Sequence, residues 1–178
     1  SAQKSTIYTH YSKDFNRAVS LFKDAQYASA QLIFNKVKEA ATTEELKSDC
    51  AYYAANCAIR TNQSNADELM EQFVSDYPTS VKQNQAYIEV AHYHFNQGNF
   101  PQALKWFDKV DESSLSRNDQ DKFNLQKGYS FFNAKKKKEA TVYLNKVVNS
   151  AEYGSQAKYY LGFMAYEGDD YMQAPKYF

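Results

Sequence analysis

The sequence predicts an all-α superhelix of about five helix-turn-helix repeats, the last one truncated. Three observations predict this fold class. Only 5 Gly and 3 Pro occur among 178 residues, and this scarcity of helix breakers favours helix. Alanine and glycine recur in two columns about three dozen residues apart. Larger apolar residues follow each small residue at helical spacing.

The two small-residue columns define the repeats. The second helix of each repeat carries an alanine, at spacings of 36, 37, 37 and 34 residues: Ala30, Ala66, Ala103, Ala140 and Ala174. Twelve residues earlier, the first helix carries another small residue: Ala18, Ala54, Ala91, Gly128 and Gly162. Antiparallel helices about 8–10 Å apart need small residues where their backbones approach most closely. The columns therefore predict one close helix crossing in each repeat.

A core stripe follows each alanine of the second helix. Four residues later stand Phe34, Met70, Phe107, Leu144 and Phe178. Three residues further on stand Val37, Phe73, Val110 and Val147. These positions share one face of a helix, so we expect them to form the core.

The expected repeats occupy residues 12–39, 43–77, 80–111, 117–149 and 153–178, within one solenoid domain covering residues 1–178. Thr42 and Glu45 form a capping-box pattern that would begin the second repeat. Pro101 and Pro175 fall in the first turn of their helices, where a missing N–H is tolerated. The sequence stops at Phe178 without a polar capping helix, so we expect a fragment of a longer array.

These residues resemble the tetratricopeptide repeat, a helix-turn-helix unit of about 34 residues. The likeness lies in the small residue of the first helix, the turn Gly98–Phe100, and the alanine of the second helix with an aromatic one turn later. Pro78 stands where the family ends a repeat with proline. The resemblance implies a right-handed solenoid that binds proteins or peptides.

Composition and motifs argue against several other functions. Lys+Arg and Asp+Glu both number 21, so the basic excess typical of nucleic-acid binders is missing. The sequence contains no run of about 18 apolar residues, so we do not expect insertion into a membrane. The sequence has no phosphate loop, nucleophile elbow or zinc motif, so we expect no enzyme activity, metal or cofactor. Cys50 and Cys57, seven residues apart on one helix, are too distant to form a disulfide and are expected to be buried.

The resemblance also implies a binding groove lined by the first helix of each repeat. In the family, inward-facing residues stand at fixed offsets from the small residue of that helix. Carried onto this sequence, these offsets give the candidate groove residues Phe15, Phe22, Ile88, His92, Phe95, Asn96, Leu125, Tyr129, Phe132, Asn133, Tyr159, Phe163 and Tyr166. The surface they would form is aromatic and nearly uncharged, as protein-binding hot spots are.

Two interpretations of these aromatic residues stay open. They line an open groove, or they pack against neighbouring repeats. Chaperone-binding members of the family hold terminal carboxylates with Lys, Asn and Arg, and the corresponding columns here are mostly apolar, so we do not expect chaperone tails as ligands. The Lys135–Lys138 run falls at a predicted turn, as either a solvated turn or a patch for an acidic partner.

The run Phe73–Ser80 is similar to the repeat ending of bacterial envelope members. Those members include the lipoprotein subunit of the outer-membrane assembly machine and the periplasmic coordinator of the Tol-Pal system. Together with the Ala-Gln near the start, this predicts a periplasmic or exported protein of a Gram-negative bacterium, the alternative being cytoplasmic. We expect a non-catalytic scaffold that binds a protein or peptide in the groove, with possible association through the truncated last helix. The alternative is an architectural spacer within a longer envelope protein.

Overall fold

The computed structural model describes residues 2–167, with side chains described from residue 11 onward. Its elements are nine α-helices and one short 3₁₀ turn, with no β-strand among the described residues. The predicted all-α helical-repeat class is therefore confirmed. Ala174, Pro175 and Phe178, on which the predicted truncated helix depends, lie outside the described residues.

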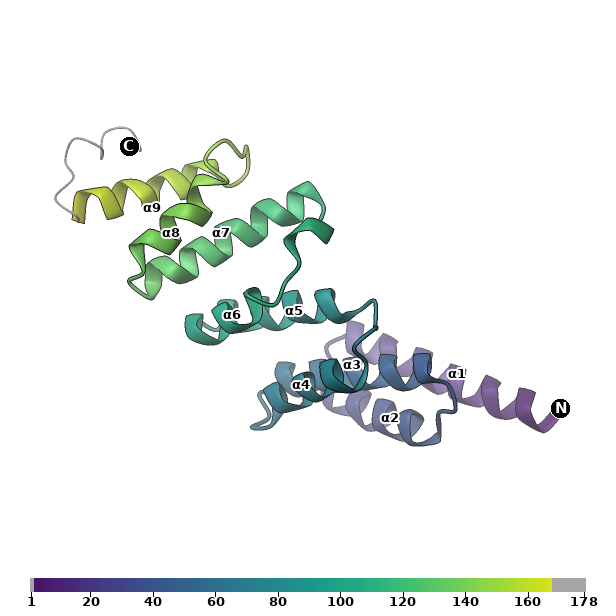
Figure 1. The fold of residues 1–178 in the computed structure, drawn as a ribbon. Helices are drawn as coiled ribbons and strands as arrows, with labels where there is room; N and C mark the ends of the chain where they lie inside the picture. The colour runs from purple at the N-terminus through teal and green to yellow at the C-terminus, as the bar shows by residue number, and fades with distance from the viewer. Residues whose placement is uncertain (1, 168–178) are drawn as a thin grey trace. The chain divides into compact units, whose positions relative to one another are not determined.

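The chain forms two compact units, one ending at Glu89 and the other beginning at Val90. Each is described by itself, and the expectation of one domain with five repeats stays a prediction. The first unit contains α1 (Ala2–Lys23), α2 (Tyr27–Ala40), α3 (Glu44–Arg60), α4 (Ala66–Asp76) and the beginning of α5 (Gln83–Asn96). In this unit α2 packs against α1 and α3, and α4 packs against α3 (Figure 1).

The second unit contains the rest of α5 and four further helices. These are α6 (Phe100–Phe107), α7 (Arg117–Asn133), α8 (Lys137–Asn145) and α9 (Gly154–Glu167), with the 3₁₀ turn η1 (Glu112–Ser114) before α7. Helix α7 is central, because α6, α8 and α9 all pack against it (Figure 1).

The same turn joins the two helices of each pair. Its residue in left-handed backbone conformation is Ala25, Asn62, Gly98 or Lys135, with φ of 61°, 56°, 73° and 62°. In each turn the next residue's N–H donates to a carbonyl five residues back, as in Gln26 to Leu21 at 2.8 Å. This is the hydrogen bond of the Schellman motif, which satisfies carbonyls left open at a helix end.

Side-chain caps fix three helix starts. Thr43 accepts a hydrogen bond from the Leu46 backbone N–H at 3.2 Å, so α3 begins at Glu44. The predicted capping box at Thr42 is therefore wrong by one residue, because Thr43 has the extended backbone that a cap requires. Ser116 caps α7 and Asn99 caps α6, and Pro101 lies in the first turn of α6 as predicted.

The small-residue columns form the helix crossings. All nine of their members within the described residues are buried: Ala18, Ala30, Ala54, Ala66, Ala91, Ala103, Gly128, Ala140 and Gly162. Phe34, Met70, Phe107 and Leu144 are completely buried one turn later. Val110 departs from the predicted stripe, because it is only half-buried after the end of α6.

Cys50 and Cys57 are buried free thiols of α3, as predicted. Burial raises the pKa of each thiol to about 12. Both side chains therefore act as small apolar groups of the core.

Buried polar groups tie the helices together within each unit. In the first, Tyr52 and Asn56 of α3 both donate to the Glu89 carboxylate of α5. In the second, Lys127 is buried between the rings of Phe123 and Tyr143, and its Nζ lies 2.9 Å from Asp108 Oδ1. The contacts of Tyr52 and Asn56 with Glu89, and of Lys127 with Asp108 and Tyr143, join residues far apart in sequence, so they fix the packing of the helices.

Candidate functional site: an aromatic surface on α5, α7 and α9

The aromatic side chains of the second unit converge on Tyr129 of α7. The centroid of its ring lies 5.7 Å from that of Phe95 in α5 and 4.9 Å from that of Tyr160 in α9. Phe100, at the start of α6, lies 5.5 Å away. All three rings meet Tyr129 edge to face, the arrangement that ring quadrupoles favour.

The contacts continue along α7 and α9 through Phe132. Its ring centroid lies 5.1 Å from that of Tyr160 and 5.6 Å from that of Phe163. We call six residues the aromatic cluster: Phe95, Phe100, Tyr129, Phe132, Tyr160 and Phe163. They come from four helices, so the cluster exists only when the helices are packed.

Helical spacing places the polar groups beside these rings. In α7, Lys122, Gln126 and Tyr129 are separated by four and three residues, so they share one face. Gln156 and Tyr160 do the same on α9. The two faces meet because α7 packs against α9 in this unit.

A cavity of about 380 Å³ lies at this meeting point. Its lining is aromatic and amide-rich: Phe95, Lys122, Leu125, Gln126, Tyr129, Tyr153, Gln156 and Tyr160. Lys122 is the one charged residue of this lining. The volume falls within the range of small-molecule and side-chain pockets.

Burial affects two polar groups of the lining, the Gln126 amide oxygen and the Tyr160 hydroxyl. Gln126 Oε1 is buried and accepts no hydrogen bond from any described residue. Burial, reinforced by the neighbouring Tyr129 hydroxyl, raises the pKa of Tyr160 above its ordinary value. Tyr160 therefore stays protonated at neutral pH and can donate a hydrogen bond.

The structure brings together most of the predicted groove residues of the second unit. Phe95, Leu125 and Tyr129 line the cavity, and Phe132 lies in the aromatic cluster. His92 is half-buried instead, with its ring edge-on to Phe107 of the core at 6.1 Å. Asn96 and Asn133 are exposed, and Asn133 Nδ2 donates to the Tyr129 carbonyl at 3.0 Å.

The predicted residues of α9 are the most accessible. Tyr159, Phe163 and Tyr166 expose 56%, 36% and 59% of their surface. They are four and three residues apart, so they form an apolar stripe along one face of α9. Exposed aromatic residues at this spacing offer a continuous contact surface.

The predicted groove residues of the first unit are placed differently. The rings of Phe15 and Phe22 lie 6.0 Å and 5.3 Å from that of Tyr53 in α3, around the buried Phe34. Ile88 is half-buried in α5. Phe15 and Phe22 therefore pack against a neighbouring helix, as one of the two interpretations expected.

Several residues of the cavity lining and of the aromatic cluster were absent from the sequence prediction. Phe100, Tyr153, Gln126 and Tyr160 do not stand at the family offsets used to choose groove residues. A signal for Tyr160 was present, because Tyr153, just before α9, and Gln156 and Tyr160 of α9 recur at spacings of three and four. Phe100 gave no such signal, since it reaches the cluster from a different helix, at the start of α6.

Comparison with known proteins supports the repeat assignment. The tetratricopeptide repeat family matches residues 49–80, which include α3 from Asp49 onward, the whole of α4, and Pro78. No curated protein sequence matches the chain.

Solved structures share the fold at low sequence identity. MamA of AMB-1 is similar with a TM-score of 0.70 and 15% identity, covering 95% of this chain and 88% of MamA. The TPR-like repeats of a putative kinesin light chain from Podosopora anserina give a TM-score of 0.66 at 13% identity, covering 94% and 91%. PlcR from Bacillus thuringiensis, in complex with the peptide PapR7 and DNA, gives 0.50 at 13% identity, covering 96% and 70%. At these identities the likeness shows the fold alone.

Every described helix is too short or too polar to span a lipid bilayer. The same residues contain no group of three His, Cys, Asp or Glu side chains that could hold a metal ion. The match to the tetratricopeptide repeat family is thus confined to residues 49–80, and for the rest of the chain the likeness to such repeats is one of fold.

Proposed function

We propose that this protein is a non-catalytic scaffold that binds a segment of a partner protein on the aromatic surface of α5, α7 and α9. Helical repeats of this type commonly serve as protein-interaction scaffolds. The likeness to PlcR, whose structure holds a peptide, is compatible with this role, although the likeness itself is one of fold.

The observation that carries the proposal is the cavity beside Tyr129. It combines aromatic walls with an unpaired acceptor, since the buried Gln126 Oε1 accepts no hydrogen bond from described residues. A buried polar atom without a partner costs about 1–3 kcal/mol. If the Gln126 side chain rotates so that Oε1 faces the cavity, a ligand N–H donor would remove this cost while the apolar part of the ligand covers the rings.

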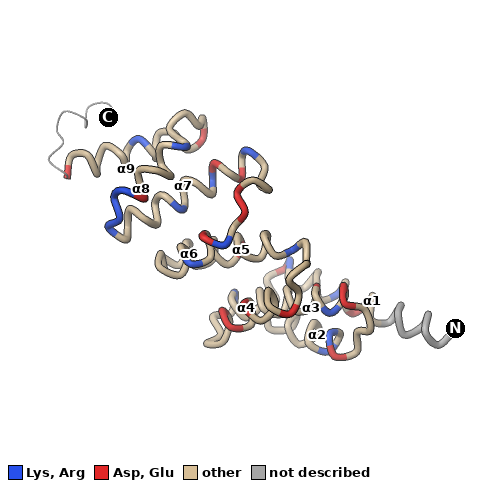
Figure 2. Tube along the Cα trace, viewed as in Figure 1, with Lys and Arg blue, Asp and Glu red and all other residues tan. Residues whose placement is uncertain are grey.

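The exposed stripe of α9 extends the same surface. Tyr159, Phe163 and Tyr166 continue from the aromatic cluster through the contact of Phe163 with Phe132. Tyrosine and phenylalanine supply large contact areas at low entropic cost, which is why aromatic anchors dominate hot spots. The charged Lys135–Lys138 run lies instead where the turn after α7 leads into α8 (Figure 2), and its four residues are exposed.

An architectural spacer is the second candidate function. The observation in its favour is that the cluster residues contact one another, so part of their surface is already covered. In that case the cavity would be an incidental result of helix packing. The two candidates differ in one measurable respect, which is whether a partner occupies this surface.

Site-specific photocrosslinking in the cells that make the protein tests the proposal. A photoreactive phenylalanine at Phe163 or Tyr159 should give a discrete adduct with one partner protein. The additional change Tyr129→Ala should abolish this adduct, because it removes the centre of the cluster. Phe15→Ala, in the first unit, is the matched aromatic control and should leave the adduct intact.

Helicity measured by circular dichroism must be retained in each variant. If folded protein gives no adduct at either position, or if Tyr129→Ala leaves the adduct unchanged, the spacer function is favoured. If Tyr129→Ala and Phe15→Ala abolish the adduct equally, the partner-binding surface is not confined to the second unit.

We also propose a periplasmic or exported location in a Gram-negative bacterium. The support is the run Phe73–Ser80, with its Tyr77-Pro78 pair at the end of α4, which resembles envelope members of the family. A fusion of the native gene product to alkaline phosphatase tests it, because that reporter is active only after export. Inactive fusion protein would favour the cytoplasmic alternative.

A further inference from the structure

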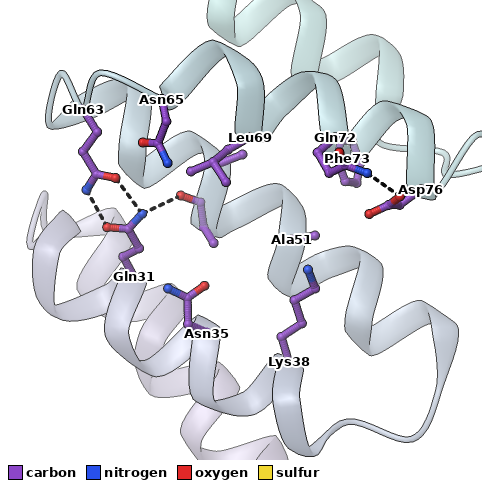
Figure 3. A pocket seen from close by; sticks show the side chains of 12 residues that line it. Gln31, Asn35, Lys38, Ala51, Gln63, Asn65, Leu69, Gln72, Phe73 and Asp76 are labelled. Atoms are coloured by element: carbon purple, nitrogen blue, oxygen red, sulfur yellow. Dashed lines mark hydrogen bonds between the residues drawn. The ribbon is translucent and has the colours of Figure 1, made fainter.

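A second cavity, of about 370 Å³, lies in the first unit between α2 and α4. Helix α3 forms its floor through Ala51, Ala54 and Ala55. We call it the amide groove, because its walls carry Gln31 and Asn35 of α2 and Asn65 and Gln72 from the opposite side (Figure 3).

At two positions the floor has side chains smaller than those at the equivalent positions of the other repeats. Ala51 stands three residues before the small residue of its helix, where the other repeats carry Phe15, Ile88, Leu125 and Tyr159. Ala55 stands one residue after it, where the others carry Val19, His92, Tyr129 and Phe163. The groove therefore exists because α3 alone has methyl groups at positions that are otherwise filled.

The walls are enriched in neutral amides. Five of the 12 lining residues are Asn or Gln, whereas the whole chain has 13 Asn and 13 Gln among 178 residues. Gln72 is an example, since the equivalent positions in other repeats are Lys36, Lys109 and Lys146. The amides are thus not required by the repeat itself.

The pairing of two amides closes one end of the groove, and the other amides leave the rest of it open. Gln31 and Gln63 bond reciprocally, with Gln63 Nε2 to Gln31 Oε1 at 2.7 Å and Gln31 Nε2 to Gln63 Oε1 at 3.2 Å. Asn35 and Asn65 point toward each other from opposite walls (Figure 3). Neither side-chain amide makes a hydrogen bond with any described residue.

We infer that the amide groove binds the main chain of a short extended peptide segment. A carboxamide donates and accepts, as a peptide backbone does, so facing amides can pair with both N–H and C=O groups of one strand. The lining carries one cation and one anion, Lys38 and Asp76, so it favours a segment without net charge. The alanine floor admits small side chains.

The length of the groove sets the length of the segment. Gln31 and Lys38 are seven residues apart on α2, which corresponds to about 10 Å of helix rise. An extended chain advances about 3.3 Å per residue, so the groove covers roughly three residues. This site is separate from the aromatic surface, and each can exist without the other.

The test is an NMR titration of the full chain, labelled with ¹⁵N, using the blocked peptide acetyl-Ser-Ala-Ser-Ala-amide. Main-chain recognition makes this simple probe sufficient, because no special side chain is needed. We expect saturable shifts of the side-chain amide signals of Asn35, Asn65 and Gln72. The aromatic-surface change Tyr129→Ala should leave these shifts intact, which separates this inference from the proposed function.

Two variants identify the groove. Ala51→Leu fills the floor with a side chain that the equivalent columns already accept, so the fold should survive and affinity should fall at least about ten-fold. Asn35→Ala with Asn65→Ala removes amides without adding volume and should weaken binding similarly. Asn118→Ala, an exposed amide of α7, is the control and should change nothing.

Two results would overturn the inference. One is the absence of saturable shifts at the groove amides in folded wild-type protein. The other is equal binding by the wild type and Ala51→Leu. Saturable shifts with N-acetylglucosamine oligomers, and none with the peptide, would also overturn it by assigning the groove to a saccharide.

Discussion

Gly128 in α7 and Leu144 in α8 meet with no room for a methyl group between them. A β-carbon placed on Gly128 would lie 2.8 Å from Leu144 Cγ and 3.2 Å from the Leu144 backbone nitrogen. Both distances are shorter than ordinary carbon contacts of about 3.5–4.0 Å. At this crossing the small-residue columns bring the two helices too close for any side chain larger than hydrogen.

Gly128→Ala should therefore destabilise the protein. Overpacking costs about 1–3 kcal/mol, which exceeds the roughly 1 kcal/mol that alanine gains over glycine inside a helix. Urea unfolding gives the difference in the free energy of unfolding. In a double-mutant cycle, Leu144→Ala should cost less in the Gly128→Ala background than in the wild type, and strictly additive costs would contradict the steric explanation.

Lys135→Gly should stabilise the protein by about 0.5–1 kcal/mol. Lys135 has φ of 62°, and a side chain in left-handed conformation costs roughly 1–2 kcal/mol, partly offset by the larger unfolded-state entropy of glycine. Thermal unfolding measures the gain. Lys138→Gly, within α8, is the matched control and should lose about 1 kcal/mol, so equal effects of the two changes would refute the argument.

Asp108→Asn should lower the free energy of unfolding by about 1–3 kcal/mol at neutral pH. The change leaves the buried Lys127 ammonium without its carboxylate partner, and charged groups are costly to leave unpaired. Lys109→Met, which removes an exposed ammonium over Trp106, serves as the control and should have little effect. Wild-type stability in Asp108→Asn would mean that the aromatic rings alone hold Lys127.

The contact between Lys127 and Asp108 should also make the free energy of unfolding depend on pH in the alkaline range. Burial lowers the pKa of Lys127, but hydrogen bonds to Tyr143 and Asp108 outweigh it and raise the pKa above its ordinary 10.5. Stabilisation by Lys127 is then complete below about pH 10.5 and is lost as the pH rises through the folded-state pKa. Unfolding curves between pH 8 and about 12 should converge for the wild type and Lys127→Met; parallel curves would disprove the linkage.

Both cysteines should resist thiol reagents in the native protein. Cys50 and Cys57 are fully buried, and burial raises their pKa to about 12, so very little thiolate exists at pH near 8. Labelling with an aromatic disulfide reagent should follow global unfolding, with two thiols reacting in denaturant. Rapid labelling of either thiol in buffer would show that α3 opens locally.

The sequence predicted the helix crossings because they depend on residue size alone. Ala30, Ala103 and Gly128 are small for a reason that repeats along the chain, so alignment of the sequence with itself finds them. Helix α3 begins at Glu44 and not one residue earlier, because the backbone angles of Thr43 decide the cap, and these depend on the preceding turn.

The candidate site was predicted only in part. Tyr129 and Phe95 were predicted from offsets that the family resemblance implies, each within its own helix, but Phe100 joins them from α6 through packing that no single-helix pattern contains. Phe15 and Leu125 both stand three residues before the small residue of their helix. Leu125 lines the cavity, whereas Phe15 packs on Tyr53, because each helix meets different neighbours. The amide groove was not predicted, since its floor and walls come from three helices.

The turn within each helix pair tolerates Ala25, Asn62, Gly98 and Lys135 in one backbone conformation. The geometry of the turn is therefore determined by main-chain hydrogen bonds and not by the identity of the side chain. Hairpins of this protein should accordingly behave as interchangeable modules, which a protein engineer could cut and rejoin at these four positions.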